Sequence, residues 1–305
     1  MVDISPSRRR LARLARIERL DPVHDHGEIY RISTGLEFPW EYLRALELAN
    51  LRTFAAPSVS GLLAATGQYA RTPRRRYEST LVLMGALGNY GYDSPLGRDA
   101  LRLINRMHRW YRISQPDLLY TLVSFVLRPF AFLDAYGWRP LSASERQAAF
   151  LHYRHIGRRI GIRDIPGDIA GMEAFAEDYE RRCFRRHPAN HAVAEQAMSV
   201  FYDRLPRPAR PAARQLVISL LDDRARDALG YDAPARSVRR AAHDALLLRR
   251  QVQRRLPPRR RSYYDHPPRL HAYPGDLHDY VLADFAVPHP TPVPPPWQKA
   301  APGRP

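Results

Sequence analysis

A segment near the middle of the chain is apolar on nearly every side. Ser114 precedes it, and its helical periodicity continues to about Ala135. A helix that is apolar all round is normally buried, so we expect a central helix around which the other elements pack. Its best apolar run, LLYTLVSFVLRPFAFL at 118–133, contains Arg128 and Pro129. The run is therefore too short and too interrupted to predict a membrane span.

Segments with helical periodicity follow one another along the rest of the chain. Ser94 and Pro95 suit the cap and the first position of one helix, and SASE at 142–145 is a capping box that starts another. Period-2 alternation and hairpin dipeptides are scarce, so we expect no sheet. The sequence predicts an all-α protein, a single globular domain of about eight to ten helices. The expected helices are 39–54, 74–90, 95–112, 115–135, 142–160, 171–186, 189–204, 208–229 and 236–256.

The two ends of the chain differ in composition from the middle. The first twenty residues are basic, and from Pro257 onward the chain is rich in Pro, Arg and His. Such composition is typical of irregular segments, and the last part reads as disordered. The predicted organisation is a basic N-terminal segment at 1–20, a helical domain at 21–262, a C-terminal extension that packs on the domain at 263–286, and a Pro-rich disordered tail at 287–305.

The formal net charge of +17 comes almost entirely from arginine, because Lys299 is the one lysine in the sequence. Residues 1–20 hold six arginines against two acids and residues 236–269 hold eleven against two, so these flanks supply +4 and +9 of it. Such flanks can contact phosphate or anionic lipid, or they can be solvated surface. We expect solvated surface and no specific nucleic-acid partner, with peripheral membrane contact through the flanks as the alternative.

The N-terminal stretch RRRLARLARIERL at 8–20 alternates arginine with apolar residues and has no continuous apolar core. It therefore does not predict a signal peptide. A short amphipathic helix that lies on a membrane or on the protein itself fits the pattern. We expect a cytoplasmic protein with neither signal peptide nor transmembrane span, attached to a membrane at most peripherally.

One histidine shares a helix face with apolar side chains. In LRLINRMHRWYRI at 101–113, His108 lies on the apolar side and the arginines lie on another. A ring that points to a core needs a polar partner, and periodicity alone leaves two readings open, a hydrogen-bonded core residue or a metal ligand. The side chains that share the face of His108 are Leu101, Ile104, Met107 and Tyr111.

A second segment, RRRYESTLVLMGAL at 74–87, puts Arg76 and Thr80 on one face with two leucines. A guanidinium and a hydroxyl one turn apart are thus presented on the inner side. Either the arginine satisfies backbone carbonyls or a carboxylate there, or the two side chains bind an anion or oxygen in a pocket. Glu78 lies nearly opposite Thr80 on the helix, so we expect it to face solvent or to form a salt bridge.

The remaining candidate sites have simpler explanations. His152 and His155 lie three residues apart on a helix and could share a ligand, but packed or solvated rings account for them without a motif such as HExxH. His187 precedes a proline at a helix start, where capping explains it. Cys183 is the one cysteine, which excludes an intramolecular disulfide framework and a four-cysteine metal site. Zinc-finger spacing, a P-loop, GxGxxG and GxSxG are absent from the sequence.

Seven segments occur in an order typical of one family, and together they cover roughly residues 25–280. On these segments the chain resembles the MpaB-type oxygenases, which are related to the latex-clearing proteins, the rubber oxygenases. A series of this kind is far more specific than any single motif. The segments are RYEST at 76–80, INRMH at 104–108, DLLYTLVSFVLRP at 117–129, YGWRPLSASER at 136–146, GIRDIP at 161–166, LDDRARDALGY at 221–231 and YPGDLHDY at 273–280.

The resemblance implies a haem b-dependent oxygenase, with dioxygen as co-substrate and a haem pocket between helices. In the latex-clearing branch one histidine binds the haem iron and follows an Arg-xxx-Thr pair by about thirty residues; here Thr80 precedes His108 by 28. The resemblance therefore implies His108 as the proximal ligand of the haem iron. It places Arg76 and Thr80 beside the haem as cofactor-binding and catalytic residues. The second ring nitrogen of such a histidine needs an acceptor, which the sequence does not identify.

The resemblance also implies a hydrophobic or isoprenoid-like substrate, with oxidative cleavage of a C=C bond as one outcome. Two departures argue against the rubber mechanism itself. Ser79 stands where the latex-clearing proteins have a lysine, and 56–70 contains no acid where they have a proposed glutamate base. The alternative function is a non-catalytic helical protein of the same fold that binds haem or a lipid.

Overall fold

The chain is all-helical wherever the structure, a computed structural model, describes it: residues 8–203, 205–265, 269–273 and 280–286, which contain no strand. The all-α prediction is confirmed, but the predicted number of helices is too low, because fourteen α-helices occur in these ranges. They are α1 (Arg8–Arg19), α2 (His26–Ile32), α3 (Pro39–Thr53), α4 (Pro57–Thr66), α5 (Gln68–Arg71), α6 (Pro73–Tyr90), α7 (Pro95–His108), α8 (Gln115–Tyr136), α9 (Ala143–Arg159), α10 (Ile169–Cys183), α11 (Pro188–Tyr202), α12 (Arg210–Ser219), α13 (Asp223–Ala228) and α14 (Arg236–Arg255), with a π-helix η1 (Ser33–Glu37) and 3-10 turns η2 (Arg207–Ala209) and η4 (Leu282–Phe285).

The helices that raise the count are mostly short and are separated by local signals. The helix expected at 208–229 is divided into α12 and α13, because Asp222 accepts the Ala225 N–H and caps a new helix start. Pro57 begins α4, and Gly67 ends it with a left-handed φ of 64°. The haem pocket of the predicted fold stays a prediction.

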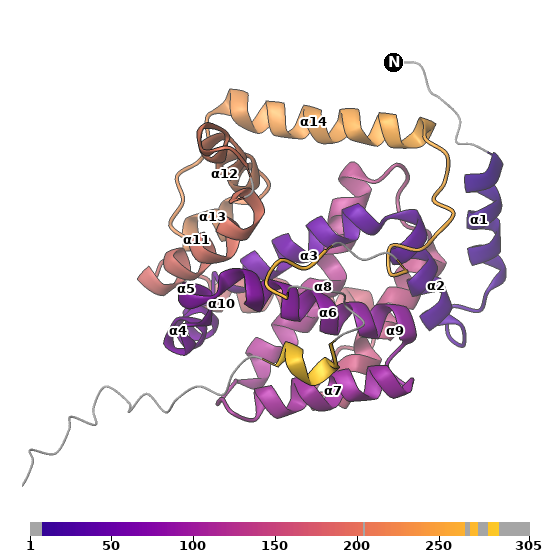
Figure 1. The fold of residues 1–305 in the computed structure, drawn as a ribbon, viewed down its shortest axis with the longest axis horizontal. Coiled ribbons are helices and arrows are strands. Elements are labelled where there is room, and N and C mark those ends of the chain that lie inside the picture. Colours follow the sequence, from indigo (N-terminus) through magenta and orange to yellow (C-terminus); the bar gives the residue numbers. More distant parts are fainter. Residues whose placement is uncertain (1–7, 204, 266–268, 274–279, 287–305) are drawn as a thin grey trace, which may run out of the picture.

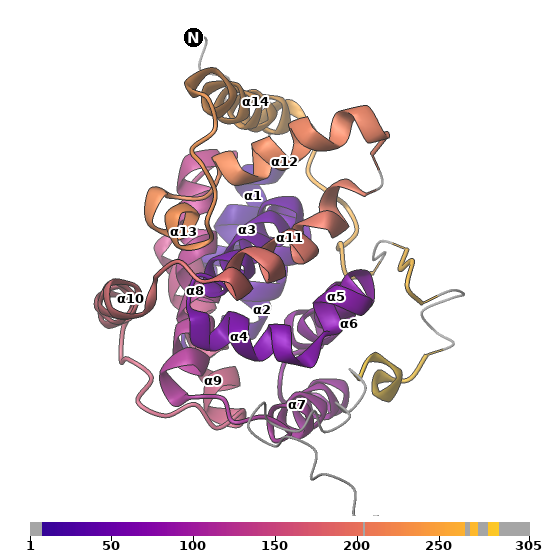
Figure 2. The same ribbon diagram turned by 90° about the vertical axis from the view of Figure 1, so that its left-hand side faces the viewer.

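Helix α8 is the centre of the bundle and packs against α3, α9 and α10 (Figure 1, Figure 2). Pro129 lies inside α8 without ending it. The central position that its composition predicts is therefore confirmed. The core around it includes Val123, Val126, Leu133, Tyr42, Phe150, Tyr153 and Met172.

Among the described helices, α8 alone is long and apolar enough to cross a membrane by length and composition. However, 61% of its most apolar window is buried inside the protein. Packing in the core therefore accounts for this composition.

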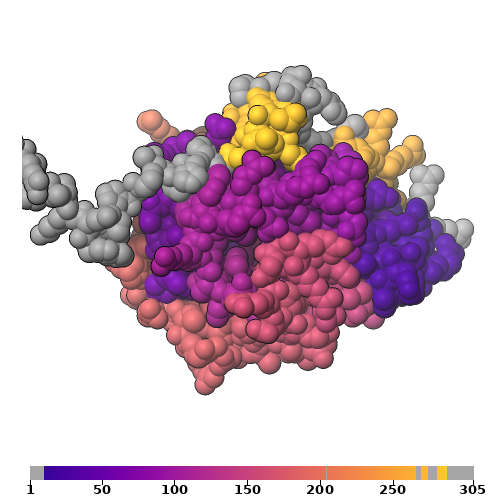
Figure 3. All heavy atoms as spheres, turned by 90° about the horizontal axis from the view of Figure 1, so that it is seen from below, coloured from indigo at the N-terminus to yellow at the C-terminus, as the bar shows by residue number. Residues whose placement is uncertain are grey.

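The described part of each basic flank contains a helix that packs on the protein, α1 in the first flank and α14 in the second. Ile17 of α1 is fully buried against Ile29, Ile32 and Ala148, so the described part of the N-terminal stretch packs on the protein itself. Near the other end, Leu270, Tyr273 and Phe285 pack against α6. Figure 3 shows the yellow η4 segment lying over the magenta helices. The predicted tail at 287–305 lies outside the described residues, and the proposed domain boundaries stay predictions.

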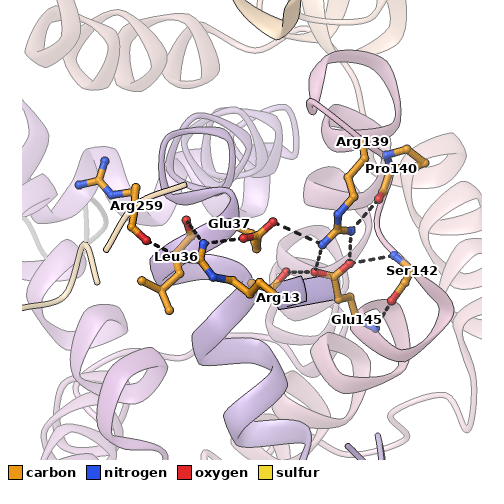
Figure 4. A network of polar contacts seen from close by, with 9 residues as sticks. Arg13, Leu36, Glu37, Arg139, Pro140, Ser142, Glu145 and Arg259 are labelled. Atoms are coloured by element: carbon orange, nitrogen blue, oxygen red, sulfur yellow. Dashed lines mark hydrogen bonds and ion pairs between the residues drawn. The ribbon is translucent and has the colours of Figure 1, made fainter. Parts of the chain in front are cut away.

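Arg139 holds two buried carboxylates together where α8 is followed by α9 (Figure 4). Its guanidinium donates to both oxygens of Glu145, at 2.5 and 2.9 Å, and lies 3.7 Å from Glu37. Arg13 of α1 donates to Glu37 at 2.6 Å and to the Arg259 carbonyl at 2.5 Å. Each carboxylate-bearing residue is 1% exposed, so the network joins α1, η1 and the start of α9 around two buried acids. The bond of Arg13 to Arg259 extends it at the surface to the segment after α14.

Replacing Arg139 with alanine will destabilise the fold by about 3–5 kcal/mol, because Glu145 and Glu37 will keep their buried charge without this partner. Equilibrium urea unfolding followed by circular dichroism measures the change. The matched control is Arg102→Ala, which removes an exposed pair with Asp99 and will cost less than about 1 kcal/mol. Equal losses in the two variants would show that the buried network does not stabilise the fold.

Candidate functional site

Helices α6 and α7 pack against each other and bring the three predicted site residues to one place. Leu83 and Leu87 of α6 contact Leu101 and Leu103 of α7, which fixes the pair side by side. Arg76 and Thr80 lie on α6 one turn apart, and His108 is the last residue of α7. The positive charge of Arg76 acts on the ring of His108 and lowers its pKa. Residues that are 28 and 32 positions apart in the sequence are thus neighbours in space.

Arg76 and Thr80 are bonded to each other. The Arg76 guanidinium donates to the Thr80 hydroxyl, and that hydroxyl donates back to the Arg76 carbonyl at 3.1 Å. The guanidinium also lies over the ring of Tyr69, 5.8 Å from its centroid. These contacts hold the cationic group on the side of α6 that meets α7.

The ring of His108 is half-buried, and its Nδ1 atom is enclosed. No residue in the described part of the chain hydrogen-bonds to that nitrogen. Burial, and then the charge of Arg76, lower the pKa of His108 to about 4, so the imidazole is neutral at pH 7. In a metal-binding histidine, the ring nitrogen that does not bind the metal usually donates a hydrogen bond to an acceptor. Among the described residues, Nδ1 of His108 has no such acceptor.

These properties fit the cofactor that the resemblance implies. Iron in haem binds a neutral imidazole nitrogen, and His108 is neutral with a ring nitrogen that makes no hydrogen bond within the described protein. Haem also carries carboxylates, and the guanidinium of Arg76 is a suitable partner for one of them.

Thr80 also borders a small apolar cavity of about 80 Å³, which we call the Thr80 cavity. Glu47 of α3 is the one carboxylate among its described wall residues. This carboxylate accepts from the Tyr77 hydroxyl at 2.5 Å and from the Arg44 guanidinium at 2.6 Å. The other walls include Leu43, Leu46, Leu51, Leu81, Met84, Phe125 and Phe201.

Burial raises the pKa of Glu47 to about 7, against the opposing effects of Arg44 and of the Tyr77 hydrogen bond. A carboxyl of this kind can hold or release a proton near neutral pH, which is the property that acid–base chemistry requires. Glu47 therefore supplies an acid in the cavity beside Thr80, although 56–70, where the resemblance led us to look for one, contains none.

Sequence reasoning missed Glu47, although a signal was present. Leu43 and Leu51 lie four residues before and after it, so the periodicity of α3 puts Glu47 on an apolar stripe. An acid on such a stripe indicates a buried carboxyl with a specific partner or role.

The expectation that Glu78 faces solvent is wrong. Its side chain does not face solvent, because the residue is only 2% exposed. Its carboxylate accepts the backbone N–H of His271 at 3.0 Å and of Ala272 at 2.8 Å. Next to it, the Ser79 hydroxyl bonds to the Tyr273 hydroxyl at 2.7 Å. The outer side of α6 therefore anchors the C-terminal segment.

His152, His155 and His187, the other histidines considered above, are packed or capping residues. His152 is 2% exposed and stacks on Tyr30 with centroids 4.0 Å apart, and burial lowers its pKa to about 3. His155 stacks on the ring of His26. His187 accepts the Ala189 N–H at 3.2 Å and caps α11, as predicted. Within the described residues, no three His, Cys, Asp or Glu side chains converge as a metal site.

Comparison with known proteins identifies the family of the chain. The family described as "ER-bound oxygenase mpaB/B'/Rubber oxygenase, catalytic domain" matches residues 42–254, a range that includes Glu47, Arg76, Thr80 and His108. The chain belongs to this oxygenase family. The resemblance that the sequence motifs indicate is therefore confirmed.

Two fungal proteins show how far the similarity extends. The ER-bound oxygenase mpaB' of Penicillium brevicompactum is 31% identical over 246 residues, which is 74% of this chain and 57% of that protein. The ER-bound oxygenase mpaB of Penicillium roqueforti (strain FM164) is 31% identical over 225 residues, which is 67% of this chain and 74% of that protein. The chain thus spans little more than half the length of the first relative.

Glu47→Gln will change how the stability of the protein depends on pH. Folding raises the pKa of this carboxyl from 4.5 to about 7. Between these values the folded protein holds a proton that the unfolded chain has released, so the contribution of Glu47 to stability falls as the pH rises. Relative to the wild type, the variant will gain about 2–3 kcal/mol between pH 4.5 and pH 7.

Urea unfolding at several pH values measures this gain. Glu28→Gln is the control, because Glu28 is an exposed acid paired with Arg16. If the stability difference between Glu47→Gln and the wild type stays constant between pH 4.5 and pH 7, Glu47 has an ordinary pKa in the folded protein.

Proposed function

We propose that the protein is a haem b-dependent oxygenase that acts on a hydrophobic substrate. The observation that carries the proposal is the neutral, half-buried imidazole of His108, whose Nδ1 makes no hydrogen bond to the described residues and which lies beside Arg76. In this proposal His108 is the proximal ligand of the haem iron. When bound, haem supplies the binding and activation of dioxygen.

The chain's own residues set the conditions around the cofactor. Arg76 balances the charge of a bound carboxylate, and its bond to Thr80 fixes both side chains. Glu47 holds or releases a proton in the Thr80 cavity, where Tyr77 and Arg44 keep its carboxylate in place. The apolar walls of that cavity exclude water and strengthen these electrostatic effects.

The substrate class follows from the same walls. Leucine, methionine and phenylalanine side chains favour an apolar molecule, such as an isoprenoid-like alkene. Cleavage of a C=C bond is the reaction we propose for it. The lysine-dependent rubber mechanism is not part of the proposal, because Ser79 replaces that lysine and bonds to Tyr273 and to the Arg75 carbonyl.

We also propose a cytoplasmic location without a specific nucleic-acid partner. Peripheral contact with anionic lipid is the alternative, and the exposed α1 residues Leu11, Arg16 and Arg19 support it.

Purified protein, as isolated or reconstituted with haem, will show the absorption spectrum of bound haem b, and His108→Ala will lose it because the iron loses its protein ligand. The control is His155→Ala, which removes another half-buried ring that lies in a stack and will retain haem. Equal haem content in His108→Ala and the wild type would exclude His108 as the ligand. Wild type that binds no haem would overturn the proposed cofactor.

The haem-loaded protein will consume dioxygen when an isoprenoid-like alkene is added. Glu47→Gln will lower that rate by at least about tenfold, because the variant cannot transfer the proton, whereas Glu28→Gln will not. An oxygen electrode measures the rates. Haem-loaded protein that takes up the alkene without consuming dioxygen would instead favour the alternative, a non-catalytic haem or lipid carrier.

A further inference from the structure

Helix α14 carries apolar side chains on the side that faces away from the protein. The helix lies along one edge of the molecule, and its inner side packs against α12 and α8 (Figure 1, Figure 2). On its other side, four exposed residues follow one another at helical spacing, and a fifth comes directly after the helix. We call this set the outer stripe: Ala241, Ala245, Leu248, Val252 and Leu256.

The outer stripe differs from what a solvated helix normally presents. Leu248 is 65% exposed and Val252 is 47% exposed, although a surface helix usually has polar residues on its outer face. Helix α7, at the opposite edge of the molecule, follows that rule (Figure 1). Its exposed residues include Arg98, Asp99, Arg102 and Arg106. A row of exposed apolar side chains such as the outer stripe favours contact with a partner.

The surroundings of the outer stripe are strongly basic. Residues 236–261 contain ten arginines and one acid, Asp244, which gives this range a net charge of +9. Helical spacing puts Arg240 and Arg255 beside the stripe, and both are exposed. The Arg240 guanidinium lies 3.8 Å from the Asp244 carboxylate, so the one acid of the range is already paired. A partner of the outer stripe must therefore accept both apolar side chains and excess positive charge.

These two requirements select among the possible partners. A second copy that used the same stripe would bring two basic surfaces together, which like-charge repulsion disfavours. Nucleic acid matches the charge, because its phosphates attract arginine, but it gives the leucine and valine side chains no apolar contact. The surface of an anionic lipid bilayer meets both requirements, since its negative headgroups lie directly above apolar acyl chains.

The end of the outer stripe is joined to α1, the other basic helix. Arg10 of α1 donates to the Leu256 carbonyl at 3.2 Å, and Arg13 donates to the Arg259 carbonyl at 2.5 Å. Leu11, between these two arginines, is 47% exposed. The two basic flanks, 246 residues apart in the sequence at these bonds, are thus held next to each other in the folded protein.

We propose that the outer stripe of α14 docks the protein on the surface of an anionic lipid bilayer. The helix then lies parallel to the bilayer, with Leu248 and Val252 in the outer acyl-chain region and Arg240 and Arg255 at the headgroups. This arrangement assigns to one surface the peripheral contact that stands above as the alternative for the location of the protein. It does not depend on the oxygenase proposal.

Co-sedimentation with lipid vesicles tests the surface. The purified protein will sediment with vesicles of phosphatidylcholine and phosphatidylserine but not with phosphatidylcholine alone, and added salt will weaken the binding. Leu248→Gln/Val252→Gln will bind the anionic vesicles at least about tenfold more weakly, because two apolar side chains no longer enter the bilayer. The matched control is Tyr90→Gln/Leu96→Gln, which replaces two exposed hydrophobic residues at the end of α6 and the start of α7 and will bind as the wild type does.

Arg240→Glu/Arg255→Glu tests the charge. Reversing two charges beside the outer stripe will weaken binding to the anionic vesicles by at least about tenfold. The control, Arg98→Glu/Arg102→Glu, makes the same change in net charge on exposed residues of α7 and will stay within about twofold of the wild type. Arg240 and Arg102 each pair with an acid on their own helix, so the two variants break similar contacts. Circular dichroism establishes that every variant is folded.

Wild type that does not bind the anionic vesicles, or a Leu248→Gln/Val252→Gln variant that binds them as well as the wild type, would overturn the docking surface. The second result would overturn it even if the charge variant bound weakly, because arginine attracts any polyanion without insertion. A dimer in sedimentation equilibrium that Leu248→Gln/Val252→Gln dissociates would identify a second copy as the partner instead. Vesicle binding requires neither haem nor oxygen consumption, so failure of the surface and failure of the oxygenase proposal give different results.

Discussion

Helix α6 contacts several parts of the chain that are distant in sequence, and this constraint decides what its polar residues do. It packs against α7, α11 and α5, with the C-terminal segment on its outer side (Figure 1, Figure 2). Buried polar groups must find partners, so each face of α6 is tied to a different part of the chain. Arg76 faces His108, Tyr77 bonds to Glu47, and Glu78 binds residues 271–272. One helix thereby connects the candidate cofactor ligand, the candidate acid and the C-terminal segment.

The high arginine content is partly structural rather than a surface for polyanions. Arg139 bridges buried carboxylates near α1, and Arg52 makes a two-pronged bond to Glu180, at 2.8 and 2.6 Å, on the other side of α8. Guanidinium groups suit such positions because they stay charged and match a carboxylate with two parallel hydrogen bonds. The walls of the Thr80 cavity, in contrast, consist mainly of apolar and tyrosine side chains.

The sequence predicts the features of this protein that depend on neighbouring residues, such as helix caps and the burial of a helix. Uniform apolarity gives the buried position of α8, and Ser94 and Ser142 cap the helices that their motifs predict. The meeting of Arg76 and His108 required the family resemblance as well as periodicity. The partner of Glu78 could not be predicted, since 193 residues separate it from His271. The short helices α4 and α5 were missed because too few residues define their period.

The anchoring of residues 271–272 by Glu78 bears on what the smallest folding unit is. The family match ends at residue 254, before the backbone N–H groups that Glu78 needs. It also begins after Glu37, the buried acid beside Arg139. A fragment trimmed to 42–254 would lack the backbone N–H groups that bind the buried carboxylate of Glu78. It would also lack Glu37, the acid beside the guanidinium of Arg139. The segment that defines the family by sequence is therefore smaller than the unit that electrostatics holds together.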